Sequence, residues 1–126
     1  MSGTQTDGQQ AIFEDIVQPG IGPGRHIHHH QDEIFFFLEG EFIAEVAGEL
    51  HECKLGDVVL IPKGTVHAFK NVGTTPGRLH YVFFPAKSIE AMFREMYAVL
   101  ETGELTFEGM SNIALQHGQE FVGPPL

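Results

Sequence analysis

Metal-ligand side chains are concentrated in residues 26–33, which read His-Ile-His-His-His-Gln-Asp-Glu. His26 and His28 are two residues apart, so on an extended strand both imidazoles project from one face and can bind one ion. Glu33 would add a carboxylate oxygen, but strict alternation places it on the opposite face, so a turn or bulge must intervene. His67 is the partner histidine from a later segment. Three imidazoles and a carboxylate suit one divalent Fe, Mn, Ni, Co, Cu or Zn ion.

Strand alternation alone permits a second pair of histidine ligands. His28 and His30 are also two residues apart, so they could share a face in the same way. His29 and His30 otherwise read as residues at the rim of the site, exposed to solvent. His51, His80 and His117 fit no ligand pattern. Cys53 is a lone cysteine without a placed base, which is typical of a packing residue.

Two sets of spaced residues frame the histidines, and together they resemble the two motifs of the cupin family. The first set is Gly20, His26, His28, Glu33 and Gly40, and the second is Gly56, Pro62, Gly64, His67 and Asn71. The resemblance implies a double-stranded β-helix, or jelly-roll barrel, with His26, His28, Glu33 and His67 as the metal ligands. The distances to Gly20, Glu33 and Gly40 also reject the pairing of His28 with His30.

The elements around the motifs are those of an all-β protein. In residues 25–84 short apolar stretches are separated by glycine turns, which is typical of a sandwich or barrel. Gly40, Gly48 and Gly56 are expected to close hairpins, because glycine tolerates positive φ, and Thr75-Pro76-Gly77 is expected to close another. We predict a β-barrel over residues 11–86, after a loose N-terminal tail of residues 1–10 that has one apolar residue.

Strand alternation extends the site to three phenylalanines. If Glu33 points inward, then Phe35 and Phe37 do so as well, and an inward His67 brings Phe69 with it. The sequence therefore predicts that Phe35, Phe37 and Phe69 line an aromatic substrate pocket beside the metal.

The opposite phase of the same strand is equally apolar. Ile34, Phe36 and Leu38 would lie on the outer face of the barrel. A strand that is apolar on both faces is expected to be covered on both, by a second sheet or by a partner subunit. We therefore expect a homodimer.

After Pro85 the hydrophobic period becomes helical, so residues 87–126 are expected to form a helical segment and tail packed on the barrel. Ser88 is the expected N-cap of the first helix and Gly103 its stop. A second helix is expected over residues 112–117, capped by Ser111. The first helix has one apolar stripe: Ile89, Met92, Phe93, Met96, Val99 and Leu100.

Length and charge exclude several classes of protein. The 126 residues are most simply one domain, and one cysteine cannot form an intrachain disulfide. Seventeen acidic against seven basic residues give a net charge of −10, which argues against nucleic acid as a partner. No apolar segment approaches the roughly 18 residues of a membrane span. We expect a cytoplasmic protein that binds a small molecule.

An ion with four protein ligands keeps about two positions open for water, dioxygen or a substrate oxygen. Glu33 is then our candidate catalytic base, since a carboxylate beside the ion can take a substrate proton. Within the cupins the chain is most similar to small relatives of quercetin 2,3-dioxygenase, on Phe83-Phe84-Pro85, the helix after it and the tail at residues 117–126. That resemblance implies an oxidoreductase, a dioxygenase acting on a small hydroxylated, aromatic substrate. A non-catalytic binding cupin and a metal-dependent isomerase or cyclase remain open.

Overall fold

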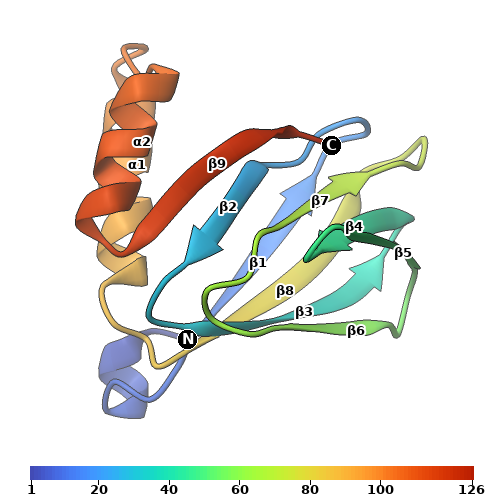
Figure 1. Cartoon of the computed structure of the whole chain (residues 1–126), viewed down its shortest axis with the longest axis horizontal. Coiled ribbons are helices and arrows are strands. Elements are labelled where there is room, and N and C mark those ends of the chain that lie inside the picture. The colour runs from blue at the N-terminus through green and yellow to red at the C-terminus, as the bar shows by residue number, and fades with distance from the viewer.

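The computed structural model describes all 126 residues as two facing β-sheets with two helices at one side (Figure 1). The four-stranded sheet has the order β1 (Ala11–Val17), β8 (Gly77–Phe84), β3 (Asp32–Glu39) and β6 (Val58–Ile61). The five-stranded sheet has the order β5 (Glu49–Cys53), β4 (Phe42–Val46), β7 (His67–Asn71), β2 (Gly24–His28) and β9 (Gln119–Pro125). The helices are α1 (Ile89–Glu101) and α2 (Phe107–Gln116). The predicted all-β jelly-roll fold with C-terminal helices is confirmed.

The residues of β3 that point into the barrel are the ones that strand alternation predicts. Glu33, Phe35 and Phe37 are almost fully buried, whereas the residues between them are only partly covered. On β7, His67 and Phe69 point into the same space from the opposite sheet.

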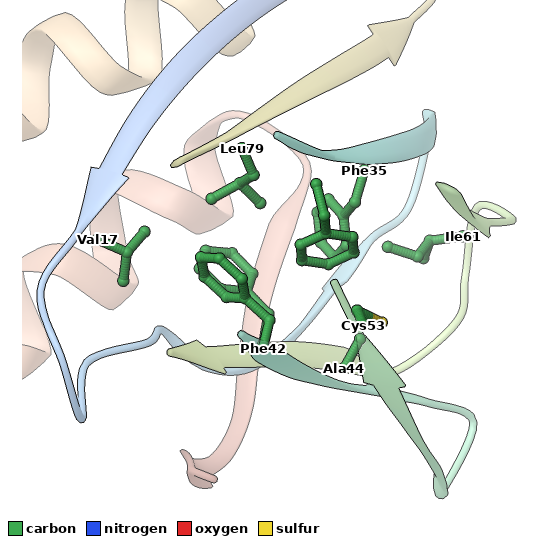
Figure 2. Close-up of a cluster of buried hydrophobic side chains, with 9 residues drawn as sticks. Val17, Phe35, Phe42, Ala44, Cys53, Ile61 and Leu79 are labelled. Atoms are coloured by element: carbon green, nitrogen blue, oxygen red, sulfur yellow. The ribbon is translucent and has the colours of Figure 1, made fainter. Parts of the chain in front are cut away.

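A cluster of buried side chains joins the two sheets (Figure 2). The rings of Phe35 and Phe69 meet edge to face with centroids 5.3 Å apart, and those of Phe37 and Phe42 lie 5.1 Å apart. Aromatic pairs at these separations add to the stabilisation from burial alone. The cluster therefore fixes the distance between the sheets. Its members are Val17, Phe35, Phe37, Phe42, Ala44, Cys53, Ile61, Phe69 and Leu79.

Of the four expected hairpins, only the one at Gly48 forms. The turns at Gly56 and at residues 75–77 connect strands of different sheets, β5 to β6 and β7 to β8. Gly48, with φ of 84°, closes the hairpin between β4 and β5 as predicted. Gly40 has φ of 93°, but its turn carries the chain from β3 in one sheet to β4 in the other, and these strands do not pair. A Cβ at Gly40 would lie 2.9 Å from the Cα of Gly77, so the crossing also needs a residue without a side chain.

The C-terminal helices differ in part from the expectation. Ser88 precedes α1, but its hydroxyl lies 2.7 Å from Nδ1 of His117 and makes no capping bond. The second helix begins at Phe107 rather than near residue 112, because the Thr106 hydroxyl accepts a hydrogen bond from the Gly109 amide and caps it there. Neither helix has the length and apolar character that crossing a membrane requires.

The residues after Gly118 were expected to be a tail, but they form β9, which lies beside β2 at the edge of the five-stranded sheet (Figure 1). An edge strand tolerates proline on its unpaired side, which explains how Pro124 and Pro125 fit there. Arg25 pairs with Glu45 at 2.6 Å and donates to the carbonyl of Pro124 at 2.8 Å, which ties down the end of β9.

The first ten residues were expected to be a loose tail. They contain a short 3₁₀ helix, Gly3–Thr6, and the Ile12 amide donates to the Met1 carbonyl at 2.8 Å. The Ala86 amide donates to the carbonyl of Gly8 at 3.1 Å. These bonds hold the segment against the start of β1 and the chain that leads to α1.

Phe42 tests the cluster between the sheets, because it is 1% exposed and contacts the rings of Phe37 and Phe69. We expect Phe42→Ala to lower the free energy of unfolding by about 3–5 kcal/mol, measured by urea denaturation. The control is Leu50→Ala, at a residue that is 62% exposed, which should cost less than about 0.5 kcal/mol. Equal costs for the two variants would contradict this account of the core.

Candidate metal centre

The structure brings the four predicted ligand residues together in the space between the sheets. His26 and His28 come from β2, His67 from β7 and Glu33 from β3 of the opposite sheet. All four are buried, and one ligand atom from each lies within 4.8 Å of the others. Two ligands at about 2.1 Å from one ion are at most about 4.2 Å apart. Small side-chain shifts would therefore let the group hold a metal ion.

Strand register explains the arrangement. His26 lies directly opposite His67 in the pairing of β2 with β7, so both rings point to the same face of that sheet. His28 shares this face through alternation. Residues 29–31 then turn the chain out of the five-stranded sheet into the four-stranded one. Glu33 consequently approaches the histidines from across the barrel, through the turn that the sequence required.

Backbone carbonyls fix the tautomers of two histidines. Nδ1 of His26 lies 2.7 Å from the carbonyl oxygen of Gly24, and Nδ1 of His67 lies 2.9 Å from that of Thr65. A carbonyl oxygen only accepts, so each Nδ1 carries the proton and each Nε2 presents a lone pair. This is the usual support for a metal-binding imidazole.

The contacts of Glu33 require a positive charge at the centre of the group. Oε2 of Glu33 lies 2.9 Å from Nε2 of His67, so two lone-pair acceptors face each other unless a proton or a metal ion lies between them. Nε2 of His28 is 3.2 Å from the same oxygen, yet neither ring nitrogen of His28 has a hydrogen-bond partner. Buried nitrogens without partners are costly. A metal ion would satisfy the carboxylate and all three imidazoles, so the residues fit the expected cofactor.

Burial and charge keep two of the ligands in their metal-binding forms. Burial and the neighbouring imidazoles lower the pKa of His26 to about 3, so its ring is neutral at physiological pH. Burial would raise the pKa of Glu33, but the imidazoles of His28 and His67 outweigh it and lower the pKa to about 2. A metal needs a neutral imidazole and an ionised carboxylate.

The group opens into a cavity of about 600 Å³, lined by 20 residues of which 12 are hydrophobic. Phe69 is among them, whereas the other two predicted pocket residues, Phe35 and Phe37, lie in the buried core cluster and do not line the cavity. No lysine or arginine lines it. The apolar wall comes from both sheets, the loop after β1 and both helices: Ile16, Val17, Ile21, Phe69, Tyr81, Phe83, Met92, Phe93, Met96, Leu100, Met110 and Phe121.

The cavity also has polar groups that were not predicted, namely the hydroxyl of Tyr81 and the side chains of Asp15, Gln18 and Gln119. Tyr81 donates its hydroxyl to Oδ2 of Asp15 at 3.0 Å, and burial together with the charges of Asp15 and Glu33 raises the pKa of Tyr81, so it stays protonated. Asp15 lies on the inward face of β1 together with Val17. A carboxylate on this otherwise apolar face was the sequence feature that could have indicated Asp15 as a cavity residue. Gln119 gave no signal, because β9 itself was not predicted.

The remaining histidines lie outside the group. His29 is exposed and pairs with Glu120 at 3.0 Å, and His30 is exposed above Gly118. Neither joins the four ligands, so the alternative pairing of His28 with His30 is not adopted. Cys53 is buried in the core cluster.

Comparisons with known proteins agree with this architecture. The family described as "Cupin domain" matches residues 13–83. An uncharacterized protein of Methanocaldococcus jannaschii is 33% identical over 82 residues, covering 65% of this chain and 66% of the relative. An oxalate oxidase of Triticum aestivum is 31% identical over 99 residues, covering 72% of this chain and 43% of the relative.

Among solved structures, a predicted oxalate decarboxylase from Thermotoga maritima is similar with a TM-score of 0.65 and 26% identity. The match covers 68% of this chain and 75% of that protein. The chain thus spans about two thirds or less of the length of the two sequence relatives, and the likeness concerns the barrel.

His67 tests the metal centre, since it is fully buried and contributes a lone pair to the group. We expect His67→Ala to lower the metal content of the purified protein by about tenfold or more, measured by plasma mass spectrometry. The circular dichroism spectrum should stay that of the folded barrel. His51→Ala, at an exposed histidine, is the control and should keep its metal. Unchanged metal in His67→Ala would refute the site.

Proposed function

The chain belongs to the cupin family, and from this premise we propose that it is a metal-dependent dioxygenase resembling quercetin 2,3-dioxygenase. Its substrate would be a small, flat, hydroxylated aromatic molecule that reacts with dioxygen. One observation carries the proposal: three histidines and a glutamate converge at the buried wall of a largely apolar cavity.

Four protein ligands leave about two positions for other oxygens, and a bound redox-active metal supplies the means to hold a substrate oxygen and to use dioxygen. Glu33 is the candidate base in this proposal. Its carboxylate is ionised, lies among the three imidazoles and lines the cavity, so it can take the proton of a substrate hydroxyl. The carbonyls of Gly24 and Thr65 hold the rings of His26 and His67 in register while this proton moves.

The chemistry of the wall favours this class of substrate. A cavity of about 600 Å³ accommodates a ligand of several rings, and its apolar wall suits an aromatic one. A phosphorylated sugar would need lysine or arginine for its phosphate, and the cavity has neither. The isomerase alternative is therefore the weaker one. A non-catalytic binding cupin or a cyclase could use the same apolar cavity and would consume no oxygen.

Oxygen uptake tests the proposal directly. The purified protein, expressed without added metal, is assayed for metal content and for oxygen consumption with a panel of flavonols and catechols. We expect about one Fe, Mn, Ni, Co or Cu ion per chain and consumption that depends on the substrate. Bound metal with no oxygen uptake from any member of the panel would refute a dioxygenase and favour a binding or cyclase role.

Glu33→Gln separates the base from the ligand. The amide keeps an oxygen that can face the ion but cannot take a proton, so we expect turnover to fall by about 10²-fold or more while metal stays bound. The measurements are the initial rate of oxygen uptake and the metal content of the same sample. Glu120→Gln, on β9 and paired with His29 outside the cavity, should match the parent rate. Full turnover in Glu33→Gln would exclude the base.

A further inference from the structure

Gln119 carries a buried amide that the protein itself does not satisfy. The residue is 6% exposed, and its Oε1 atom is sealed from solvent and accepts no hydrogen bond. Leaving such a group unpaired lowers the stability of a protein. Nothing in the fold of the metal-free chain compensates for it.

A second buried glutamine shows what a structural amide in this chain looks like. Gln31 is 4% exposed, and its Nε2 atom donates to the carbonyls of Pro85 at 3.0 Å and Ala86 at 2.8 Å. Those bonds tie the turn before β3 to the chain before α1. Gln119 carries the same amide group and is nearly as buried, but its Oε1 has no hydrogen-bond partner in the protein.

The position of Gln119 points to a ligand. Gln119 is the first residue of β9 and lies directly opposite His28 in the pairing of β9 with β2. Directly paired residues have side chains on the same face, with Cβ atoms about 4.5–5.5 Å apart. His28, Glu33 and Gln119 all line the cavity. Gln119 is therefore a neighbour of the ligand residue His28 in the wall of the cavity.

We propose that Gln119 is a substrate-binding residue that hydrogen-bonds the oxygen adjacent to the one held at the metal-binding group. The NH₂ of the amide can donate to a ligand oxygen, and rotation of the amide would instead turn its oxygen toward the ligand as an acceptor. The assignment selects compounds with oxygens on two neighbouring carbons, such as catechols and hydroxyketones. It rests on the proposed function for the aromatic nature of the substrate.

The opposite wall adds a second polar contact. Asp15 and Tyr81 belong to the four-stranded sheet, whereas Gln119 belongs to the five-stranded one. Tyr81 occupies one oxygen of Asp15 and leaves the other to accept from a ligand hydroxyl. A flat molecule with paired oxygens at one end and a hydroxyl at the other would satisfy both walls.

Thermal stability gives the first test, and it needs neither turnover nor ligand. Gln119→Leu removes an unpaired buried amide, so we expect its Tm to rise by about 3–5 °C in the metal-free protein. Gln31→Leu is the matched control, and we expect its Tm to fall by at least as much because two carbonyls lose their donor. A lower Tm for Gln119→Leu would show that the amide is structural and would overturn the proposal.

Ligand binding gives the second test. The zinc-loaded protein is titrated by calorimetry with catechol and with phenol, without dioxygen, so that no turnover occurs. We expect the parent to prefer catechol and Gln119→Leu to bind catechol about tenfold more weakly, with phenol unchanged. Gln31→Leu should keep the preference of the parent.

Several results would overturn the role of Gln119. These are unchanged binding of catechol by Gln119→Leu, an equal loss for catechol and phenol, and a parent that binds neither compound. Because the test involves no oxygen, its outcome is separate from that of the dioxygenase proposal. A selective loss for catechol without oxygen uptake in the parent would leave Gln119 as the recognition residue of a non-oxygenase.

A separate observation concerns the outer face of the four-stranded sheet. Val58 and Leu60 are 56% and 57% exposed there, beside a hollow of about 630 Å³ that has no acidic lining residue. Glu14 lies in the middle of β1, opposite His80 of the hollow, and its carboxylate pairs with Arg78 at 2.9 Å and lies 3.2 Å from Nε2 of His80. The apolar side chains of this face are Ile12, Ile34, Phe36, Leu38, Val58, Leu60, Val82 and Phe84.

We infer that a second copy of the chain covers this face. Four strands about 4.8 Å apart and up to eight residues long span roughly 500 Å² in projection, which reaches the lower bound of about 500 Å² per partner for a biological interface. The chain carries a net charge of −10, so copies repel each other unless they meet where acidic groups are absent. The hollow of this face has no acidic lining residue, and the charge of the neighbouring Glu14 is balanced by Arg78.

Leu60→Glu tests the dimer with little risk to the fold, because the side chain is exposed in the single chain. Light scattering after size exclusion should give the parent twice the 13.9 kDa of one chain, and Leu60→Glu should give one chain mass. Leu50→Glu, exposed on β5 of the other sheet, should remain dimeric. A parent of one chain mass, a dimeric Leu60→Glu or a monomeric Leu50→Glu would overturn the inference.

Discussion

The structure depends on one buried contact, in which the carboxylate of Glu33 reaches from the four-stranded sheet to the histidines of the other. A carboxylate with 3% exposure is costly to bury without a positive charge beside it. The chain places no lysine or arginine there, and the backbone holds His26 and His67 with their lone pairs inward. The protein therefore has a centre of negative potential that a proton relieves in part and a metal ion relieves fully.

The aromatic cluster between the sheets sets the separation of the ligand residues at that centre. Phe35 follows Glu33 in the inward phase of β3, and Phe69 follows His67 in that of β7, so the packed pair sets how far the ligands of the two sheets stand apart. Phe69 also lines the cavity, whereas Phe35 lies wholly within the core cluster. Other parts of the cavity wall come from α1, α2 and β9.

Local rules placed His26 and His28 on one face, whereas the resemblance to the cupin motifs was needed to add Glu33 and His67 to them. Neither was sufficient for the elements that surround the ligands. The face shared by His26 and His28 follows from alternation within one strand, and the inward phase that contains Glu33 and Phe37 follows in the same way. The turn at Gly40 has the positive φ of a hairpin turn, but it connects two sheets. The strands on either side of it pair with β8 and β7, which lie far along the chain. Because Pro124 and Pro125 argue against a strand, β9 was not predicted. It forms because it can pair with β2 at the edge of the sheet. Gln119 could not be found without that strand.

The contrast between Gln31 and Gln119 bears on how such a cavity discriminates among ligands. An apolar wall holds any flat molecule of suitable size, because dispersion and burial are not directional. Discrimination therefore falls to the few polar atoms that water does not reach, since a ligand that leaves them unpaired loses more than one that pairs them gains. In the proposed role the metal-binding group would hold one oxygen of a ligand, and the Gln119 amide and the Asp15–Tyr81 pair are polar groups of the cavity that could recognise the others. If the proposals hold, the four ligand residues supply the reactive centre, and polar residues of β1, β8 and β9 determine which ligands bind beside it.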